Sequence, residues 1–293
     1  MAIQWSTSHG PYGIKVRYRL QGISRPTSMA LDIIKALIDL IDLIHLCGYS
    51  LDGHLALKNL YWLPNSKMIK ISGLVIGQMV KKNKSRIKGD FASMHNFIRD
   101  CVFAGSKVPG ELKTLMKLMI TDPIMYGNLI RDNIMLLNDE SKVGRYISLH
   151  QKLTRVRKID EQMYLCALTY LKCGRCDRTQ NWQIVVLYNS ALASVFERED
   201  AVYPADDAGV SWYGCNCCHH VLDHSVGYEN NKVIKFTFAD IFPMLECFIP
   251  GLFAELEEAL FAIIEIHYSQ ELRSLSAYRA PTDLSADENA QHL

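Results

Sequence analysis

The alternation of apolar and polar positions predicts a mainly helical chain with a few short strands. Apolar residues recur every three or four positions from Met29 to Cys47, which predicts a long helix that ends at Gly48. Two short apolar runs, 57–63 and 68–76, flank the turn residues Pro64-Asn65-Ser66 and predict an antiparallel hairpin. The same helical spacing recurs over residues 90–104, 110–120, 124–137, 144–170 and 251–275.

Strand signals mark two segments in the second half of the chain. Gln183-Ile184-Val185-Val186-Leu187-Tyr188 is rich in β-branched residues, and residues 232–238 alternate apolar and polar side chains. The predicted fold class is therefore α+β, with a mainly helical first part, a small antiparallel β element and a cysteine-rich C-terminal part.

Composition narrows the classes of function. The chain has 293 residues, of which 49% are hydrophobic, and its 32 Lys and Arg nearly balance its 31 Asp and Glu. A net charge of +1 provides no general attraction to nucleic acid or to an anionic membrane, so neither is expected as a partner. The most apolar segments, 31–46 and 252–266, are interrupted by charged residues, and no apolar stretch at the N-terminus has the length of a secretory signal. We expect a cytoplasmic or nuclear protein whose nine cysteines are reduced thiols or metal ligands.

The order of motifs between residues 45 and 91 resembles the carboxy-terminal lobe of eukaryotic protein kinases. A long helix ends in His45-Leu46-Cys47-Gly48-Tyr49, and Asp52-Gly53-His54-Leu55 and Asn59 follow it. Ile69-Lys70-Ile71-Ser72 then precedes Gly89-Asp90-Phe91, which opens another helix. In kinases a long helix leads into the catalytic loop, a small hairpin and the D-F-G motif. The resemblance covers about residues 27–135.

The resemblance implies a role for each matching position. With Asn59 aligned on the catalytic-loop asparagine, Asp52 takes the place of the loop histidine and His54 that of the catalytic aspartate. Lys70 lies in the strand that leads to the D-F-G position, where this chain has Gly73. Asp90 matches the buried aspartate that opens the central helix of the lobe and holds the catalytic loop.

The departures from the kinase pattern predict a lobe without phosphotransfer activity. Phosphoryl transfer needs one aspartate to accept the hydroxyl proton and another to hold Mg²⁺, and neither is present. No G-x-G-x-x-G or V-A-I-K motif precedes the lobe, so we expect no ATP as cofactor. Two alternatives are a residual nucleotide-dependent activity that uses His54 and a generic helical domain that carries a hairpin. The basic run 81–88 is expected to be a solvated loop, with a phosphate-binding patch as its alternative.

Two C-x-x-C pairs predict a structural zinc site. Cys173 with Cys176 and Cys215 with Cys218 have the spacing with which two tight turns present four thiolates to one ion. With the predicted strand 183–188 between them, the pairs are similar to a zinc ribbon. The ligand set stays open, because four other side chains could replace a cysteine: Cys217, His219, His220 and His224. A redox-active Cys173–Cys176 pair and incidental core cysteines are the alternatives. Four lone cysteines are expected in the core: Cys47, Cys101, Cys166 and Cys247.

These features predict four regions and a non-catalytic function. The regions are an N-terminal arm or edge strand (1–26), a kinase-lobe-like helical region (27–145), a zinc-stabilised α+β region (146–275) and a disordered tail (276–293). The expected function is that of a regulatory or scaffold protein that binds another protein, whose identity the sequence does not give. The alternatives are a thiol oxidoreductase, a nucleotide-dependent enzyme, or a lobe followed by a helical ribonuclease tail, as in the kinase–endoribonuclease family. In its length and its lack of an intact catalytic set, the chain is also similar to orphan proteins of dominant male sterility in wheat, which implies a plant developmental regulator.

Overall fold

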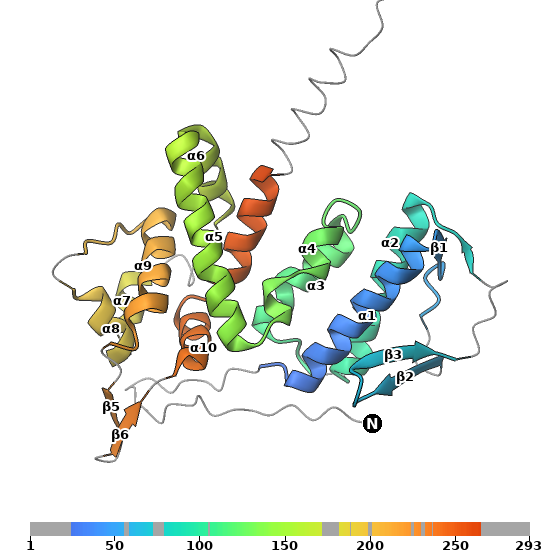
Figure 1. Ribbon diagram of the computed structural model, residues 1–293, viewed down its shortest axis with the longest axis horizontal. Helices are drawn as coiled ribbons and strands as arrows, with labels where there is room; N and C mark the ends of the chain where they lie inside the picture. Colours follow the sequence, from blue (N-terminus) through green and yellow to red (C-terminus); the bar gives the residue numbers. More distant parts are fainter. Residues whose placement is uncertain are drawn as a thin grey trace, which may run out of the picture.

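The computed structural model places helices along most of the chain and confines the strands to three small ladders (Figure 1). It describes residues 25–55, 59–72, 79–104, 106–171, 182–187, 189–198, 201–223, 226–229, 232–235 and 237–264. The predicted N-terminal arm and the predicted disordered tail lie almost entirely outside these residues. The α+β class with a mainly helical content is confirmed.

The first region combines helices with two of the ladders. Its helices are α1 (Ser28–Leu46), α2 (Lys84–Phe97), the π-helix η3 (Ile98–Val102), the 3-10 turn η4 (Gly110–Leu112), α3 (Lys113–Thr121), α4 (Gly127–Arg131) and the 3-10 turn η5 (Ile134–Leu136). Strand β1 (Tyr49–Ser50) pairs antiparallel with β4 (Val80–Lys81), and β2 (Leu60–Leu63) pairs antiparallel with β3 (Met68–Ile71). The predicted hairpin is therefore present, with Tyr61 opposite Lys70.

The second region is built mainly of helices. These are α5 (Asp139–Ile159), α6 (Glu161–Tyr170), α7 (Trp182–Val186), α8 (Ser190–Phe196), α9 (Asp207–His220), α10 (Phe238–Phe248) and a last helix over residues 252–264. One antiparallel ladder joins β5 (Val226–Glu229) to β6 (Lys232–Lys235) and confirms a strand within 232–238. The strand predicted over 183–188 is wrong, because residues 182–186 form α7. No helix among the described residues is long and apolar enough to cross a membrane.

Helix α1 illustrates how the apolar spacing becomes packing. Thr27 caps its first turn by accepting a hydrogen bond from the amide of Ala30 at 3.1 Å. Ile34, Leu37 and other apolar residues of one face are buried. The chain leaves the helix at Gly48, whose φ of +87° suits a residue without a Cβ.

The predicted basic loop 81–88 differs from the structure. Its first residue belongs to β4, and residues 84–88 form the start of α2. Lys82 donates to the carbonyl of His45 at 2.7 Å, and Arg86 pairs with Asp52 at 3.2 Å. Two of the five cationic side chains in this segment therefore make contacts near the end of α1 and the start of α2.

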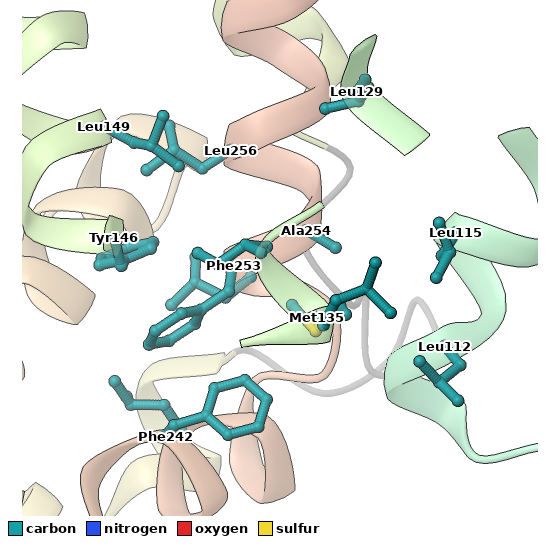
Figure 2. Packing of buried hydrophobic residues seen from close by; sticks show 14 of the residues in the cluster. Leu112, Leu115, Leu129, Met135, Tyr146, Leu149, Phe242, Phe253, Ala254 and Leu256 are labelled. Atoms are coloured by element: carbon teal, nitrogen blue, oxygen red, sulfur yellow. The ribbon is translucent and has the colours of Figure 1, made fainter. Parts of the chain in front are cut away.

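The apolar core continues from the first region into the second through the last helix (Figure 2). Phe253 stacks on Tyr146 of α5 at a centroid distance of 4.3 Å and meets Phe242 of α10 edge-on at 5.0 Å. Helix α9 approaches α5 closely at Gly214, where a Cβ would lie 2.6 Å from Leu252 and 2.8 Å from the hydroxyl of Tyr146. The two regions therefore share one buried core.

A buried group of charges lies beside this core. Lys142 is fully buried on α5, and its ammonium lies 4.1 Å from the centroid of Phe242 and 3.4 Å from carboxylate oxygens of Glu111 and Asp139. Arg25 donates two hydrogen bonds to Asp139, at 2.7 and 2.9 Å. Such a group must be paired to be tolerated away from water, and it connects the residues before α1 to η4 and α5.

Glu246 of α10 completes this group as a protonated acid. Burial raises its pKa to about 8, helped by the charge of Glu111, while a hydrogen bond from Gly251 and the charges of Lys142 and Arg25 act in the opposite direction. Its carboxyl accepts the amide of Gly251 at 3.1 Å. At neutral pH the folded protein therefore holds a proton here that the unfolded chain releases.

We predict that Glu246→Gln flattens the pH dependence of stability. The unfolded carboxyl loses its proton near its ordinary pKa of 4.5, whereas the folded one keeps it to about pH 8. Wild-type stability should therefore fall as pH rises between these values, and the variant should lose less stability over that interval. Urea denaturation at pH 5, 6.5 and 8 measures the slope. Glu140→Gln, at an exposed position of α5, is the control, and a variant slope equal to that of the wild type contradicts the assignment.

Candidate functional site

The loop that follows α1 is organised around the carboxylate of Asp90. Asn83 caps α2 by accepting the amide of Arg86 at 3.0 Å, and nearly two turns later the helix directs Asp90 inward. Only 1% of Asp90 is exposed. A buried carboxylate is unfavourable unless donors surround it, so its neighbours define the conformation of the loop.

Four groups donate to Asp90. The hydroxyl of Ser50 lies 2.7 Å from its Oδ2, and Nε2 of His45 lies 2.8 Å from the same oxygen. The amide of Gly53 donates to Oδ1 at 2.8 Å, and the amide of Leu51 to Oδ2 at 3.2 Å. One side chain on α2 therefore joins the end of α1, strand β1 and the loop.

These donors keep Asp90 ionised. Burial by itself would raise its pKa, but the hydrogen bonds from His45, Gly53, Ser50 and Leu51 outweigh burial and lower the pKa below its ordinary value. Hydrogen bonds to a charged group are stronger than neutral ones. The loop is consequently held by a charge that water does not reach.

The loop backbone needs unusual angles to reach the carboxylate. Asp52 has a φ of +53° and Gly53 a φ of +77°, in the left-handed region. Gly53 also packs against Gly89, whose carbonyl oxygen would lie 3.5 Å from a Cβ at position 53. The side chain of Ser50 supports the turn by accepting the amide of Asp52 at 2.9 Å.

The structure places most of the other kinase-like positions near this loop or on the hairpin. His54 is exposed, and its amide donates to the carbonyl of Leu51 at 3.0 Å. The carbonyl of Asn59 accepts the amide of Ser72 at 2.8 Å and extends the β2–β3 ladder, in which Lys70 is exposed. Gly73 lies outside the described residues.

Neither carboxylate in the described part of the loop is free to act on a substrate. The carboxylate of Asp90 is buried, and that of Asp52 pairs with Arg86. His54, which the resemblance aligns with the kinase base, has an exposed imidazole. An imidazole can accept a proton, but holding Mg²⁺ in phosphoryl transfer requires oxygen ligands.

His45 and Ser50 are hydrogen-bond partners of Asp90 that sequence reasoning did not single out. Both are polar residues that become buried, His45 in the last turn of α1 and Ser50 in β1. The sequence could have indicated a buried hydroxyl at Ser50, because this small polar residue lies between Tyr49 and Leu51. The sequence did not show that both face one carboxylate about 40 residues further along the chain.

The predicted cysteine site is placed only in part. Cys215 and Cys218 lie on helix α9 and not at a turn, so the knuckle geometry expected for this pair is wrong. Their i, i+3 spacing still puts both side chains on one side of the helix. Burial raises the pKa of Cys215 to about 11 and raises that of Cys218 as well. Cys173 and Cys176 lie outside the described residues.

The alternative ligands do not gather around this pair in the described part of the chain. No group of three or more His, Cys, Asp or Glu side chains there could hold a metal ion. Cys217 is fully buried, His219 is exposed, and His220 contacts Asp223 at 3.1 Å. His224 is not among the described residues, so the zinc hypothesis depends on where residues 172–181 bring Cys173 and Cys176.

The lone cysteines divide between surface and interior. Cys47 and Cys166 are exposed, which makes the prediction that they are core residues wrong. Cys101 and Cys247 are half-buried, and burial raises the pKa of both thiols.

Comparisons of the chain with protein-family models, with curated proteins and with solved structures found no match in any of the three. The resemblances to kinase lobes, to zinc ribbons and to plant male-sterility proteins therefore stay predictions. The proposed function therefore rests on contacts within the chain, above all those of Asp90 with the loop.

We predict that Asp90→Asn destabilises the protein by about 3 kcal/mol, because the amide replaces a charge that accepts four hydrogen bonds. Since its folded pKa is lowered, the contribution of Asp90 is complete above its ordinary pKa of 3.8 and is lost as pH falls through the folded value. Urea denaturation at pH 7 and at decreasing pH measures both effects. Asp52→Asn, on the exposed side of the loop, should cost less than about 1 kcal/mol, and equal costs for the two variants would contradict this account.

The zinc hypothesis predicts one zinc ion per purified chain. Cys173→Ser combined with Cys215→Ser should remove it, because each substitution takes one thiolate from the proposed set. Elemental analysis by mass spectrometry measures the zinc, and Cys47→Ser, at an exposed position, is the control. Since Cys215 is buried, Cys173→Ser alone provides a second variant. A zinc-free wild type with a reducible Cys173–Cys176 disulfide would instead favour thiol redox chemistry.

Proposed function

We propose that this chain is a non-catalytic regulatory or scaffold protein that binds another protein through a kinase-like lobe without phosphotransfer activity. The observation that carries the proposal is the contact of Asp90 with the loop amides of Leu51 and Gly53. The resemblance gives this role to the aspartate that opens the central helix of a kinase lobe. The prediction that Asp90 itself opens a helix is wrong, because α2 begins six residues earlier, at Lys84. Under this proposal, Asp90 shapes the loop as its counterpart shapes a kinase catalytic loop, while the loop side chains differ from those of an active kinase.

The chemistry of the loop supports a binding role over a transfer role. Phosphoryl transfer depends on positioned carboxylates and on the Mg²⁺ that they hold. In the kinase-like alignment, His54 and Gly73 stand at the positions of those carboxylates. A stable loop that lacks these groups can still present a defined surface to a partner.

Exposed apolar side chains near the loop support the same role. Leu43 and Leu46 lie one turn apart at the end of α1 and are 58% and 74% exposed. Tyr49 follows in β1 and is 37% exposed. Apolar side chains that gather at one end of an element are a feature of protein-binding surfaces.

The helical second region favours a second candidate, a metal-independent ribonuclease tail like that of the kinase–endoribonuclease family. Among the described residues between the two cysteine pairs, α7 and α8 occupy the stretch where the sequence predicted a strand. General acid–base cleavage of RNA would need imidazoles at the surface, and His219 and His220 provide two at the end of α9. Incubation with a labelled stem–loop RNA in EDTA tests this candidate. If the wild type cleaves the RNA and the double variant His219→Ala, His220→Ala does not, the chain is a ribonuclease and the scaffold proposal is wrong.

The first test of the scaffold proposal is nucleotide binding. We predict that Mg-ATP leaves the melting temperature unchanged, although a ligand at 100 times its Kd would stabilise the fold by about 2.7 kcal/mol. A shift that Asn59→Ala or Lys70→Ala removes would contradict the proposal and favour a residual nucleotide-dependent activity.

A second experiment tests the binding of a protein partner directly. Affinity capture from native extract should retain a partner with the wild type and lose it with Leu43→Glu plus Leu46→Glu. The control reverses an exposed ion pair on the same helix, Lys35→Glu with Asp39→Lys, whose charged atoms lie 3.7 Å apart. Partner loss in the control alone, or in neither variant, would contradict binding through this end of α1.

A further inference from the structure

We propose that the surface at the end of α1 binds an acidic amphipathic segment of a protein partner, with an apolar stripe and carboxylates along one edge. The inference rests on the proposed function and names the partner chemistry of the same surface. The surface consists of five exposed residues: Leu43, Leu46, Tyr49, Lys81 and Lys84. Figure 1 shows α2 and strand β1 beside α1.

The apolar part of this surface comes from the last turns of α1 and from β1. Leu43 and Leu46 have the i, i+3 spacing that places two side chains on one side of a helix. Tyr49 follows as soon as the chain has left the helix at Gly48. These three side chains, the apolar stripe, stay largely in water in the described structure, and a partner that covers them would gain the hydrophobic contribution.

Strand pairing places a lysine next to the apolar stripe. Tyr49 lies directly opposite Lys81 in the β1–β4 ladder, and both residues are exposed. Opposite residues of an antiparallel ladder point to the same face, so the two side chains leave the ladder together. The amide of Lys82 donates to the carbonyl of Gly48 at 3.0 Å and holds β4 at the end of α1. Positive charge therefore borders the stripe along β4.

The first turn of α2 adds positive charge where helices usually carry negative charge. It contains Lys84 and Arg86 and no acidic residue. The N-terminal end of a helix has partial positive charge, so cations there are unfavourable unless carboxylates lie nearby. Arg86 has such a carboxylate in Asp52, at 3.2 Å. A partner carboxylate near Lys84 would provide the same compensation for the second cation.

The nearby acidic residues are already engaged within the chain. Three of them pair with cations of their own: Asp39 with Lys35 at 3.7 Å, Asp42 with Arg131 at 3.5 Å and Asp52 with Arg86 at 3.2 Å. Lys81 and Lys84 have no ion pair among the described residues. The stripe is therefore bordered on the α2 side by uncompensated positive charge, which is complementary to carboxylates on a partner.

The combination of charge and apolar area favours a protein segment over the other anionic macromolecules. Phosphate groups of a nucleic acid would neutralise the lysines but leave Leu43 and Leu46 in water. An anionic membrane attracts a basic surface by about 1 kcal/mol for each cation, and this surface has only two unpaired lysines beside the ion-paired Asp39 and Asp42. An amphipathic helix with acidic residues matches both the stripe and the lysines.

The test uses a fluorescein-labelled helical peptide of about 18 residues, in which leucines form one stripe and glutamates flank it. Fluorescence anisotropy with the full chain should show saturable binding, and a peptide with lysine in place of glutamate should bind about tenfold more weakly. Lys81→Glu plus Lys84→Glu, and separately Leu43→Glu plus Leu46→Glu, should each weaken the acidic peptide about tenfold. Raising NaCl from about 0.05 to about 0.5 M should weaken it as well.

The matched control changes the net charge equally at a distant place. Lys152→Glu plus Arg155→Glu replaces two exposed cations of α5 and should leave the affinity unchanged. Lys81 and Lys84 are exposed, and Lys84→Glu puts an acid into the first turn of α2, where negative charge is favourable. Circular dichroism and the melting temperature of the lysine variant should therefore match those of the wild type.

Several results would overturn the proposal. One is the absence of saturable binding of the acidic peptide, or equal affinity for the acidic and the basic peptide. Another is equal weakening by the two charge-reversed variants, which would show attraction to net charge alone. If a labelled oligonucleotide or vesicles of phosphatidylserine and phosphatidylcholine bind through Lys81 and Lys84 while the acidic peptide does not, the surface belongs to nucleic acid or to a membrane.

Affinity capture distinguishes failure of this inference from failure of the proposed function. A captured partner that is lost with Leu43→Glu plus Leu46→Glu but retained with Lys81→Glu plus Lys84→Glu would overturn the acidic chemistry and leave the scaffold proposal standing. A partner lost with both variants, and released by salt, is the result that we expect. Absence of any captured partner would contradict the scaffold proposal itself.

Discussion

A buried negative charge constrains the first half of this fold. Asp90 lies in the interior, where an unpaired carboxylate would cost several kcal/mol, and its donors come from three separate pieces of chain. The end of α1, strand β1 and the following loop must therefore meet at one point on α2. The left-handed angles at Asp52 and Gly53 are the backbone conformations that bring the loop amide of Gly53 to the carboxylate.

The second half depends on a different kind of contact. Tyr146 and Lys142 lie one turn apart on α5, and they meet Phe253 and Phe242 from the last helix and α10. Lys142 also joins Glu111 of the first region, so the same helix connects apolar packing to paired charge. A cavity beside α6 lies further along the same side of α5, towards the C-terminal end of that helix.

The sequence predicted elements well where one signal dominated. The spacing of apolar residues from Met29 to Cys47 predicted α1 to within a residue at each end, and the turn around Pro64 predicted the β2–β3 hairpin. Asp90 was also selected from sequence, although His45 and Ser50 were not recognised as its partners, because those contacts span about 40 residues of chain.

The sequence predictions that were wrong failed for physical reasons. The β-branched run at 183–188 has high strand propensity, yet Val186 is buried and Trp182 packs against Phe196 and Tyr213 within a helical environment. Tertiary packing thus overrides local propensity. The spacing of Cys215 and Cys218 fits a zinc knuckle, but three residues is also nearly one helical turn, so spacing alone cannot distinguish the two. The cavity beside α6 was not foreseen, because its lining comes from segments that only the fold brings together.

The central claim is that Asp90 holds the loop, and amide hydrogen exchange at Leu51 and Gly53 tests it most directly. In the wild type, both amides should exchange slowly, because each donates to the buried carboxylate. In Asp90→Asn they should exchange much faster, while the amides of α5 keep their protection. Equal protection of the two loop amides in wild type and variant would contradict the claim that this carboxylate organises the loop.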